Sequence, residues 1–261
     1  MPRLGRLRFL LSLGAVLGFA LMASTARAGP LTLILTAADG ATVTIAGPPI
    51  GTFSNDGNSL TVTNIALLNA FLAANGTLLQ LNTLSASSDF APNAGDPIAS
   101  FVSLTGSLYY DTALSGSGTL TVEVLQAGFL LPTASAGGVG TLFGSSVNSF
   151  NMAPAGSFQT FGGIWSDPVY SAPLTSTSTG LMQNNYSLSN LTAIPMFVTP
   201  FQLSSVITFN ILPNSNATDA FTGSTGATAA AIPEPASVVL MSISMPLTLV
   251  LVGWLRRRRA A

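Results

Sequence analysis

Apolar and polar residues alternate with a period of two in several short segments of the chain. Residues 41–46 place Val43 and Ile45 on one side and threonines on the other. Residues 118–124 and 205–212 repeat this pattern. Alternation rich in Val, Ile and Thr predicts β-strands with one buried face. Further strands are expected at residues 31–36, 60–63, 101–110 and 158–165, and a short helix at residues 67–74 that ends at Asn75-Gly76.

Turn-forming dipeptides separate these segments, among them Asp39-Gly40, Pro48-Pro49 and Asp167-Pro168. Many short strands with polar, glycine-rich connections predict an all-β fold, specifically an antiparallel, jelly-roll-like β-sandwich. We expect this ectodomain to span residues 29–220. Residues 221–231 are small and polar, which is typical of a flexible linker.

The N-terminal segment, residues 1–28, has the pattern of a signal peptide. Arginines precede an apolar run over residues 9–22, and Ala26 and Ala28 frame a small-x-small cleavage site. Cleavage there makes Gly29 the first residue of the mature chain. The alternative is an uncleaved membrane anchor, but a run of about 14 apolar residues is short for a span that needs about 20.

The C-terminal segment, residues 232–261, combines three features in a fixed order. Pro233, Glu234 and Pro235 form a short extended motif. An uncharged stretch over residues 236–255 follows, long enough to cross ~30 Å of hydrocarbon as a helix. The basic cluster Arg256, Arg257, Arg258 and Arg259 comes directly after it. Because positive charge stays on the cytoplasmic side, the body of the chain is expected to face outward.

Together these three features resemble the PEP-CTERM sorting domain. The resemblance covers residues 232–261 and implies recognition at Pro233-Glu234-Pro235 by exosortase, a membrane-embedded protease-transpeptidase. It also implies a Gram-negative bacterium that makes exopolysaccharide and a biofilm or floc matrix. The expected location is therefore outside the inner membrane, at the cell surface or beyond it, with transient anchoring by the helix and removal of the leader by signal peptidase. A plain C-terminal anchor is the alternative.

The charge distribution excludes many functions for residues 29–231, the body of the chain between the two terminal segments. Charged residues make up 7% of the sequence, and all eight basic residues lie in the terminal segments. Between Gly29 and Ala231 there is no Lys, Arg, His or Cys, whereas eight acidic residues are present. Nucleic-acid binding is not expected without cations. A Ser-His-Asp triad, thiolate or imidazole metal sites and disulfides are excluded as well. We expect no cofactor and no enzyme activity.

The remaining chemistry rests on carboxylates and aromatic rings. Paired carboxylates would be needed for glycoside hydrolysis, but most of them sit in turn-like contexts. Asp56, in Asn55-Asp56-Gly57-Asn58, is a weak calcium candidate, and a hairpin turn is the favoured explanation of this segment. Four aromatic residues are candidates for stacking on sugars, although rings on strands commonly pack in the core. They are Tyr109, Tyr110, Trp165 and Tyr170.

These observations favour a structural or adhesive matrix protein without enzymatic activity. The alternative is a carbohydrate-binding module for exopolysaccharide.

Overall fold

The computed structural model describes residues 30–54, 57–89, 99–129, 140–166, 170–194 and 201–229. Within these ranges lie thirteen strands and one helix. The elements are β1 (Thr32–Thr36), β2 (Thr42–Ile45), β3 (Gly51–Phe53), β4 (Ser59–Val62), α2 (Ile65–Ala74), β5 (Leu79–Ser88), β6 (Ala99–Tyr110), β7 (Thr119–Phe129), β8 (Gly140–Asn151), β9 (Phe158–Ser166), β10 (Tyr170–Thr177), β11 (Asn184–Ile194), β12 (Phe201–Asn210) and β13 (Thr218–Ala229). Each strand that the sequence predicts is confirmed.

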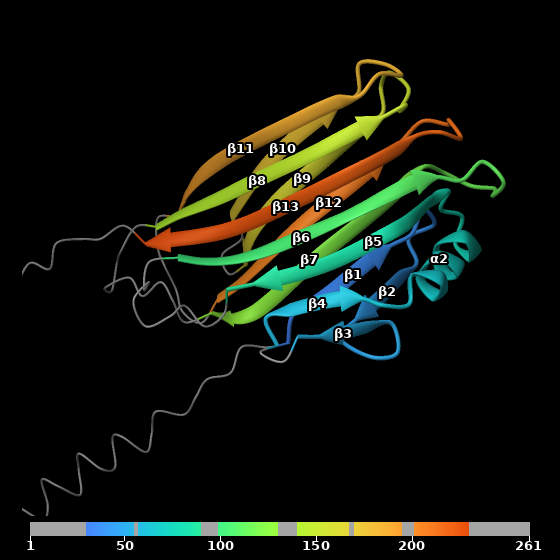
Figure 1. Cartoon of the computed structure of the whole chain (residues 1–261). Helices are drawn as coiled ribbons and strands as arrows, with labels where there is room; N and C mark the ends of the chain where they lie inside the picture. Colours follow the sequence, from blue (N-terminus) through green and yellow to red (C-terminus); the bar gives the residue numbers. More distant parts are fainter. Residues whose placement is uncertain are drawn as a thin grey trace, which may run out of the picture.

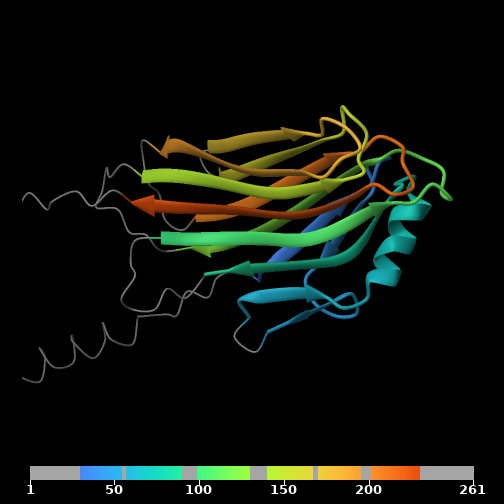
Figure 2. The same ribbon diagram turned by 45° about the horizontal axis from the view of Figure 1, so that its top comes forward.

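Two antiparallel sheets pack face to face (Figures 1 and 2). Sheet A has the strand order β10-β9-β12-β7-β1-β2, and sheet B has the order β11-β8-β13-β6-β5-β4-β3. From β6 to β13 the chain changes sheet at every step except between β9 and β10. The resulting orders β6-β13-β8-β11 and β7-β12-β9-β10 correspond to the eight strands of a jelly roll. The predicted antiparallel β-sandwich is confirmed.

The core lies between the two sheets because every second residue of the strands points inward. Leu120, Val122 and Val124 of β7 are buried, while Thr121 and Glu123 between them are partly exposed. At one place the core is aromatic: the rings of Trp165 and Phe201 stack with centroids 3.8 Å apart. The buried apolar residues run from Leu31 to Ala227. A segment spanning residues 29–231 therefore contains both sheets and the whole described core.

Helix α2 covers one end of the sandwich (Figure 2). The side chain of Asn64 caps its N-terminus by accepting a hydrogen bond from the Leu67 N–H at 3.1 Å. Leu68 and Leu72, four residues apart, are its buried side chains. Asn75 is the C-cap, as the sequence predicts. The helix covers the end of the core that the strands leave open.

The predicted linker is the clearest departure from the sequence analysis. Residues through Ala229 belong to β13, which pairs with β6 and β8 in the middle of sheet B. Gly223 and Thr225 are among its inward-facing residues, and small residues such as these are typical of a linker in the sequence. They fit because a large side chain faces them: a Cβ on Gly223 would lie 2.7 Å from the Phe161 ring. The β-sandwich therefore extends beyond residue 220.

The predicted leader and sorting tail lie outside the described residues. This includes Ala26, Ala28 and Gly29 at one end and residues 230–261 at the other. In the portion of the chain that the structure describes, no helix combines the length and apolar character needed to cross a membrane.

Candidate functional site

The outer face of sheet B carries hydroxyl side chains in register across its strands. Six strands each contribute one serine at the same level, which we call the serine row. Its members, in strand order, are Ser189, Ser145, Ser224, Ser103, Ser87 and Ser59. Neighbouring strands lie about 4.8 Å apart, so the hydroxyl groups are evenly spaced across the sheet.

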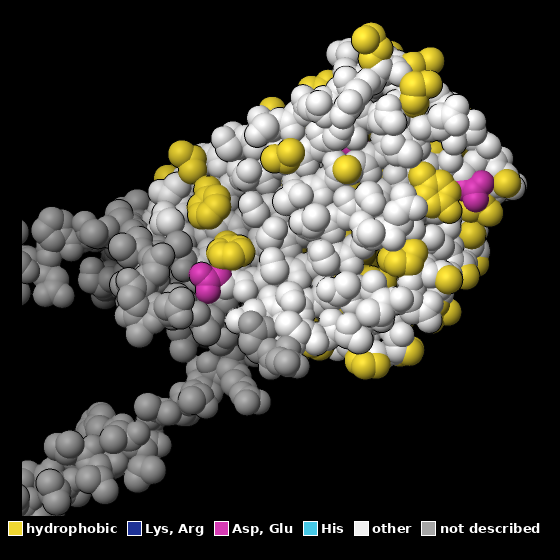
Figure 3. Space-filling model, in the orientation of Figure 1, with side chains coloured by type: hydrophobic (Ala, Val, Ile, Leu, Met, Phe, Trp, Pro, Cys, Tyr) yellow, Lys and Arg dark blue, Asp and Glu magenta, His cyan; other side chains and the backbone are white. Residues whose placement is uncertain are grey.

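A second row runs parallel to the serine row, two residues further along each strand. Its members are Ser187, Val147, Thr222, Thr105, Ser85 and Thr61. We call the outward side chains of these two rows the hydroxyl face. None of them is charged, and each Ser or Thr hydroxyl can both donate and accept hydrogen bonds. Figure 3 shows this side of the molecule, where uncharged polar surface predominates and acidic side chains appear mainly toward the margins.

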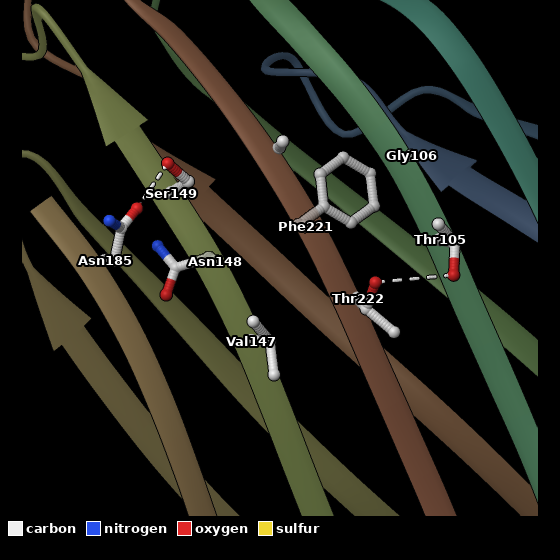
Figure 4. A pocket seen from close by; sticks show the side chains of 9 residues that line it. Thr105, Gly106, Val147, Asn148, Ser149, Asn185, Phe221 and Thr222 are labelled. Atoms are coloured by element: carbon white, nitrogen blue, oxygen red, sulfur yellow. Dashed lines mark hydrogen bonds between the residues drawn. The ribbon is translucent and has the colours of Figure 1, made fainter. Parts of the chain in front are cut away.

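A shallow hollow of about 340 Å³ lies in this face at Ala220 (Figure 4). It exists because Ala220 is a small, exposed residue between larger ones on β8 and β6. Phe221 and Gly106, both buried, form its floor. The hollow is lined by Thr105, Gly106, Val147, Asn148, Ser149, Asn185, Ala220, Phe221 and Thr222.

Hydrogen bonds fix the polar rim of this hollow. The Ser149 hydroxyl donates to Asn185 Oδ1 at 2.6 Å. Gln183 Nε2 donates to the same Ser149 hydroxyl at 3.1 Å. On the other side, the Thr105 hydroxyl donates to that of Thr222 at 3.5 Å. The rim therefore presents oriented amide and hydroxyl groups above an apolar floor.

A second hollow of about 350 Å³ opens further along the same side of the sandwich. It is lined by Ser54, Asn58, Ser59, Ser87, Ser88, Asp89 and Phe101. The two hollows share strand β6, where Thr105 borders the first and Phe101 the second. Four residues of strand separate them by about 13 Å. Ser103, a member of the serine row, lies between them on β6, so hydroxyl groups connect the two hollows.

Two of the four aromatic residues proposed for sugar stacking are buried. Trp165 is 0% exposed and stacks on Phe201, and Tyr110 is 3% exposed. Both rings belong to the core, so in this structure they have no free face for a sugar. Burial also raises the pKa of the Tyr110 hydroxyl. Tyr109 points outward from β6 beside the first hollow and is partly exposed, whereas Tyr170 pairs with Trp165 at the start of β10.

The described carboxylates do not assemble into a metal site. Among the described residues, no group of three or more His, Cys, Asp or Glu side chains is close enough to hold a metal ion. Glu123 lies on the outer face of sheet A, where burial raises its pKa and a hydrogen bond with Ser204 opposes the change. Asp56, the calcium candidate, lies outside the described residues.

Asp219 differs from the other described carboxylates, which are exposed or partly exposed, because its side chain is buried. It is 1% exposed and points into the sandwich from β13. Its Oδ1 accepts a hydrogen bond from the Ser149 N–H at 3.2 Å, while its Oδ2 has no hydrogen-bond partner among the described atoms. Burial raises its pKa to about 8, and the contacts with Ser149, Asn148 and Ala220 only partly offset that change. Asp219 is therefore a neutral acid at pH 7.

Sequence reasoning missed the hydroxyl face because four of its six strands were not predicted. The serine row takes Ser145 from β8, Ser189 from β11, Ser224 from β13 and Ser87 from β5, and none of these strands is among those predicted. Alternation of Ser or Thr with larger residues, as in residues 184–194, is the signal that was available.

Comparisons with known proteins add a loose likeness in fold. No family model and no curated sequence matches the chain. Among solved structures, a carbohydrate-binding module, TmCBM61 in complex with β-1,4-galactotriose, is 12% identical over 58% of this chain and 91% of its own, with a TM-score of 0.25. The CBM22-1 xylan-binding domain from Paenibacillus barcinonensis Xyn10C is 10% identical over 60% and 90%, also with a TM-score of 0.25. A further carbohydrate-binding module of the β-sandwich superfamily is 13% identical over 73% and 82%, with a TM-score of 0.27. TM-scores this low assign no ligand to this chain.

Proposed function

We propose that this chain is an exported, non-enzymatic protein of a bacterial surface or matrix that binds an extended polysaccharide along the outer face of sheet B. The observation that carries the proposal is the pair of shallow hollows joined by rows of uncharged hydroxyl groups on one face. The leader and the PEP-type tail support the exported location and exosortase processing by their sequence alone, since they lie outside the described residues.

The chemistry of the face fits a sugar polymer better than other partners. A sugar presents several hydroxyl groups, each a donor and an acceptor, and the Ser, Thr and Asn side chains of the face match both roles. A body without Lys, Arg or His offers no cation to an anionic polymer. The polysaccharide expected here is therefore neutral.

The shallowness of the hollows indicates a polymer as the ligand. One hydrogen bond contributes a net free energy of about 0.5–1.5 kcal/mol, because both groups are hydrated before binding. A monosaccharide in one open hollow would therefore bind weakly. A chain that reaches both hollows, about 13 Å apart, makes several contacts at once and gains from the high effective concentration of the second site.

The test is affinity electrophoresis of residues 29–231 in gels that contain neutral polysaccharides, including the exopolysaccharide of the source bacterium. Ala220→Phe fills the first hollow at an exposed position and should weaken retardation by at least tenfold. Thr175→Phe is the matched control: it adds a ring at an exposed position on sheet A and should leave retardation unchanged. If no polysaccharide retards the unmodified chain, or if both variants lose binding equally, the hydroxyl face is not a sugar site.

A further inference from the structure

The four edges of the two sheets differ in how well they are protected. Strand β2 ends sheet A and strand β3 ends sheet B on one side of the sandwich, and these strands have only four and three residues. Strands β10 and β11 form the edges on the other side, with eight and eleven residues. Because unpaired backbone groups on a long edge strand can pair with another chain, β10 and β11 are the edges to compare.

Strand β10 is protected by its neighbour. It contains Pro173, which has no N–H to offer. Three of its backbone carbonyls accept hydrogen bonds from inward-facing side chains of β11. Asn190 Nδ2 donates to the Pro173 carbonyl at 3.1 Å, the Thr192 hydroxyl donates to the Ser171 carbonyl at 2.7 Å, and the Tyr186 hydroxyl donates to the Thr177 carbonyl.

Strand β11 has none of the usual protective features. It contains no proline and no charged residue, and it pairs with β8 over its whole length without a register shift. Sheet B ends at β11, and no other strand among the described residues pairs with its outer side. Leu191, near its C-terminal end, is 71% exposed, and its N–H donates to the neighbouring Asn190 Oδ1 at 2.8 Å. Long, flat, uncharged edges of this kind favour intermolecular pairing.

We propose that β11 is a self-association edge, where two copies of this chain pair antiparallel and join their B sheets into one. A second copy is the occupant that fits because the strand is neutral and therefore does not repel itself. Ser189 is the central residue of the eleven. With a two-fold axis there, Ser189 faces its counterpart and the serine row continues into the partner. The inference stands independently of sugar binding.

The size of the contact predicts a weak, concentration-dependent pair. Eleven residues of strand span about 36 Å, and a strip about 10 Å wide buries about 360 Å² per copy. The total of about 700 Å² is below the ~1,200 Å² of a stable interface. Pairing should therefore be slight in dilute solution and substantial where copies are concentrated at a surface or along one polymer.

Cysteine cross-linking tests the geometry directly, because the sequence contains no cysteine. Cβ atoms directly opposite each other in an antiparallel pair lie about 4.5–5.5 Å apart, close enough for disulfide formation after small adjustments. In residues 29–231 and in the full chain in mild detergent, Ser189→Cys should give a covalent dimer under mild oxidation, whereas Ser187→Cys, which lies opposite Leu191 of the second copy in this register, should not. Thr44→Cys, exposed on the opposite edge strand β2, is the control and should stay monomeric.

A charge swap supplies the second measurement. Ser189→Lys and Ser189→Glu should each weaken self-association in sedimentation velocity by at least tenfold, since like charges then face each other across the axis. An equimolar mixture of the two variants should restore it. Two results would overturn the proposal: cross-linking of Ser189→Cys no faster than that of the Thr44→Cys control, or a mixture no more associated than either variant alone.

Discussion

Asp219 gives the most quantitative test of how this sandwich is built. Its side chain is buried, and burial raises its pKa to about 8 from the ordinary value of 3.8. The body has no Lys, Arg or His that could compensate an ionised carboxylate. Between these two pKa values the unfolded chain binds fewer protons than the folded one, so the free energy of unfolding must fall as pH rises. The stabilisation is complete below pH 3.8 and disappears on passing pH 8.

The magnitude follows from the same linkage. One pH unit in this window costs about 1.4 kcal/mol, so raising the pH from 5 to 7 removes about 2.7 kcal/mol through Asp219 alone. Asp219→Asn keeps the oxygen that accepts from the Ser149 N–H and replaces the protonated oxygen with an amide that never ionises. We expect the variant to match the unmodified chain below pH 3.8, where Asp219 is protonated in both states, and to be more stable by about 4 kcal/mol at pH 7.

Urea unfolding of residues 29–231 at several pH values measures this difference. Trp165 is the only tryptophan in that segment, and its full burial makes its emission a reporter of unfolding. Glu123→Gln is the control, because burial also raises the pKa of Glu123, but the side chain is partly exposed and should give a smaller effect. An Asp219→Asn variant that keeps the full pH slope, or that is less stable at pH 7, would show that Asp219 is ionised in the folded state.

Three further predictions concern packing. Gly118→Ala should destabilise the fold by about 2–3 kcal/mol in the same urea titration, because its Cβ would lie 1.9 Å from the Ile211 carbonyl oxygen. Gly162→Ala is the control: nothing lies within 4 Å of its new Cβ, so it should be neutral or slightly stabilising. Trp165→Ala should cost about 3–5 kcal/mol by removing a core ring, as judged by the thermal midpoint from circular dichroism, and Tyr109→Ala should leave that midpoint nearly unchanged. Asn64→Ala should cost about 1 kcal/mol by removing the cap of α2, measured in urea by circular dichroism.

The sequence predicts strands well where buried positions hold large aliphatic residues. In β7 and β12, Val122, Val124, Ile207 and Phe209 point inward and give a clear period of two. This alternation is sufficient to predict an antiparallel sandwich, because strands with one buried face must pack against a second layer.

Two of the strands that the sequence misses, β8 and β13, have small or polar inward residues, and the reason lies in the opposite sheet. Gly223 of β13 is buried beside the Phe161 ring of β9, so the volume that one strand lacks is filled by a side chain far away in sequence. Strand β8 likewise turns Ser146 and Asn148 inward, where they bond to Gln159 and Ser176 of sheet A. Such partners are set by tertiary packing, which hydrophobic periodicity within one strand does not contain.

The scarcity of charged side chains predicts how sugar binding and self-association respond to ionic strength. The hydroxyl face and β11 carry no charged side chain, and Asp89 is the one charged residue that lines either hollow, so sugar binding and pairing form few ion pairs and release few counterions. Raising salt from about 0.01 M to about 1 M shortens the Debye length from ~30 Å to ~3 Å and would weaken any contact that depends on ion pairs. We expect retardation by polysaccharide and sedimentation of the paired chain to change less than about twofold over that range, as contacts formed by hydroxyl groups and backbone amides do not depend on screening.

A steep loss of either with salt would mean that acidic residues outside the face carry the interaction. An increase in self-association with salt would instead indicate that repulsion between the acidic bodies limits pairing, while leaving β11 as the contact.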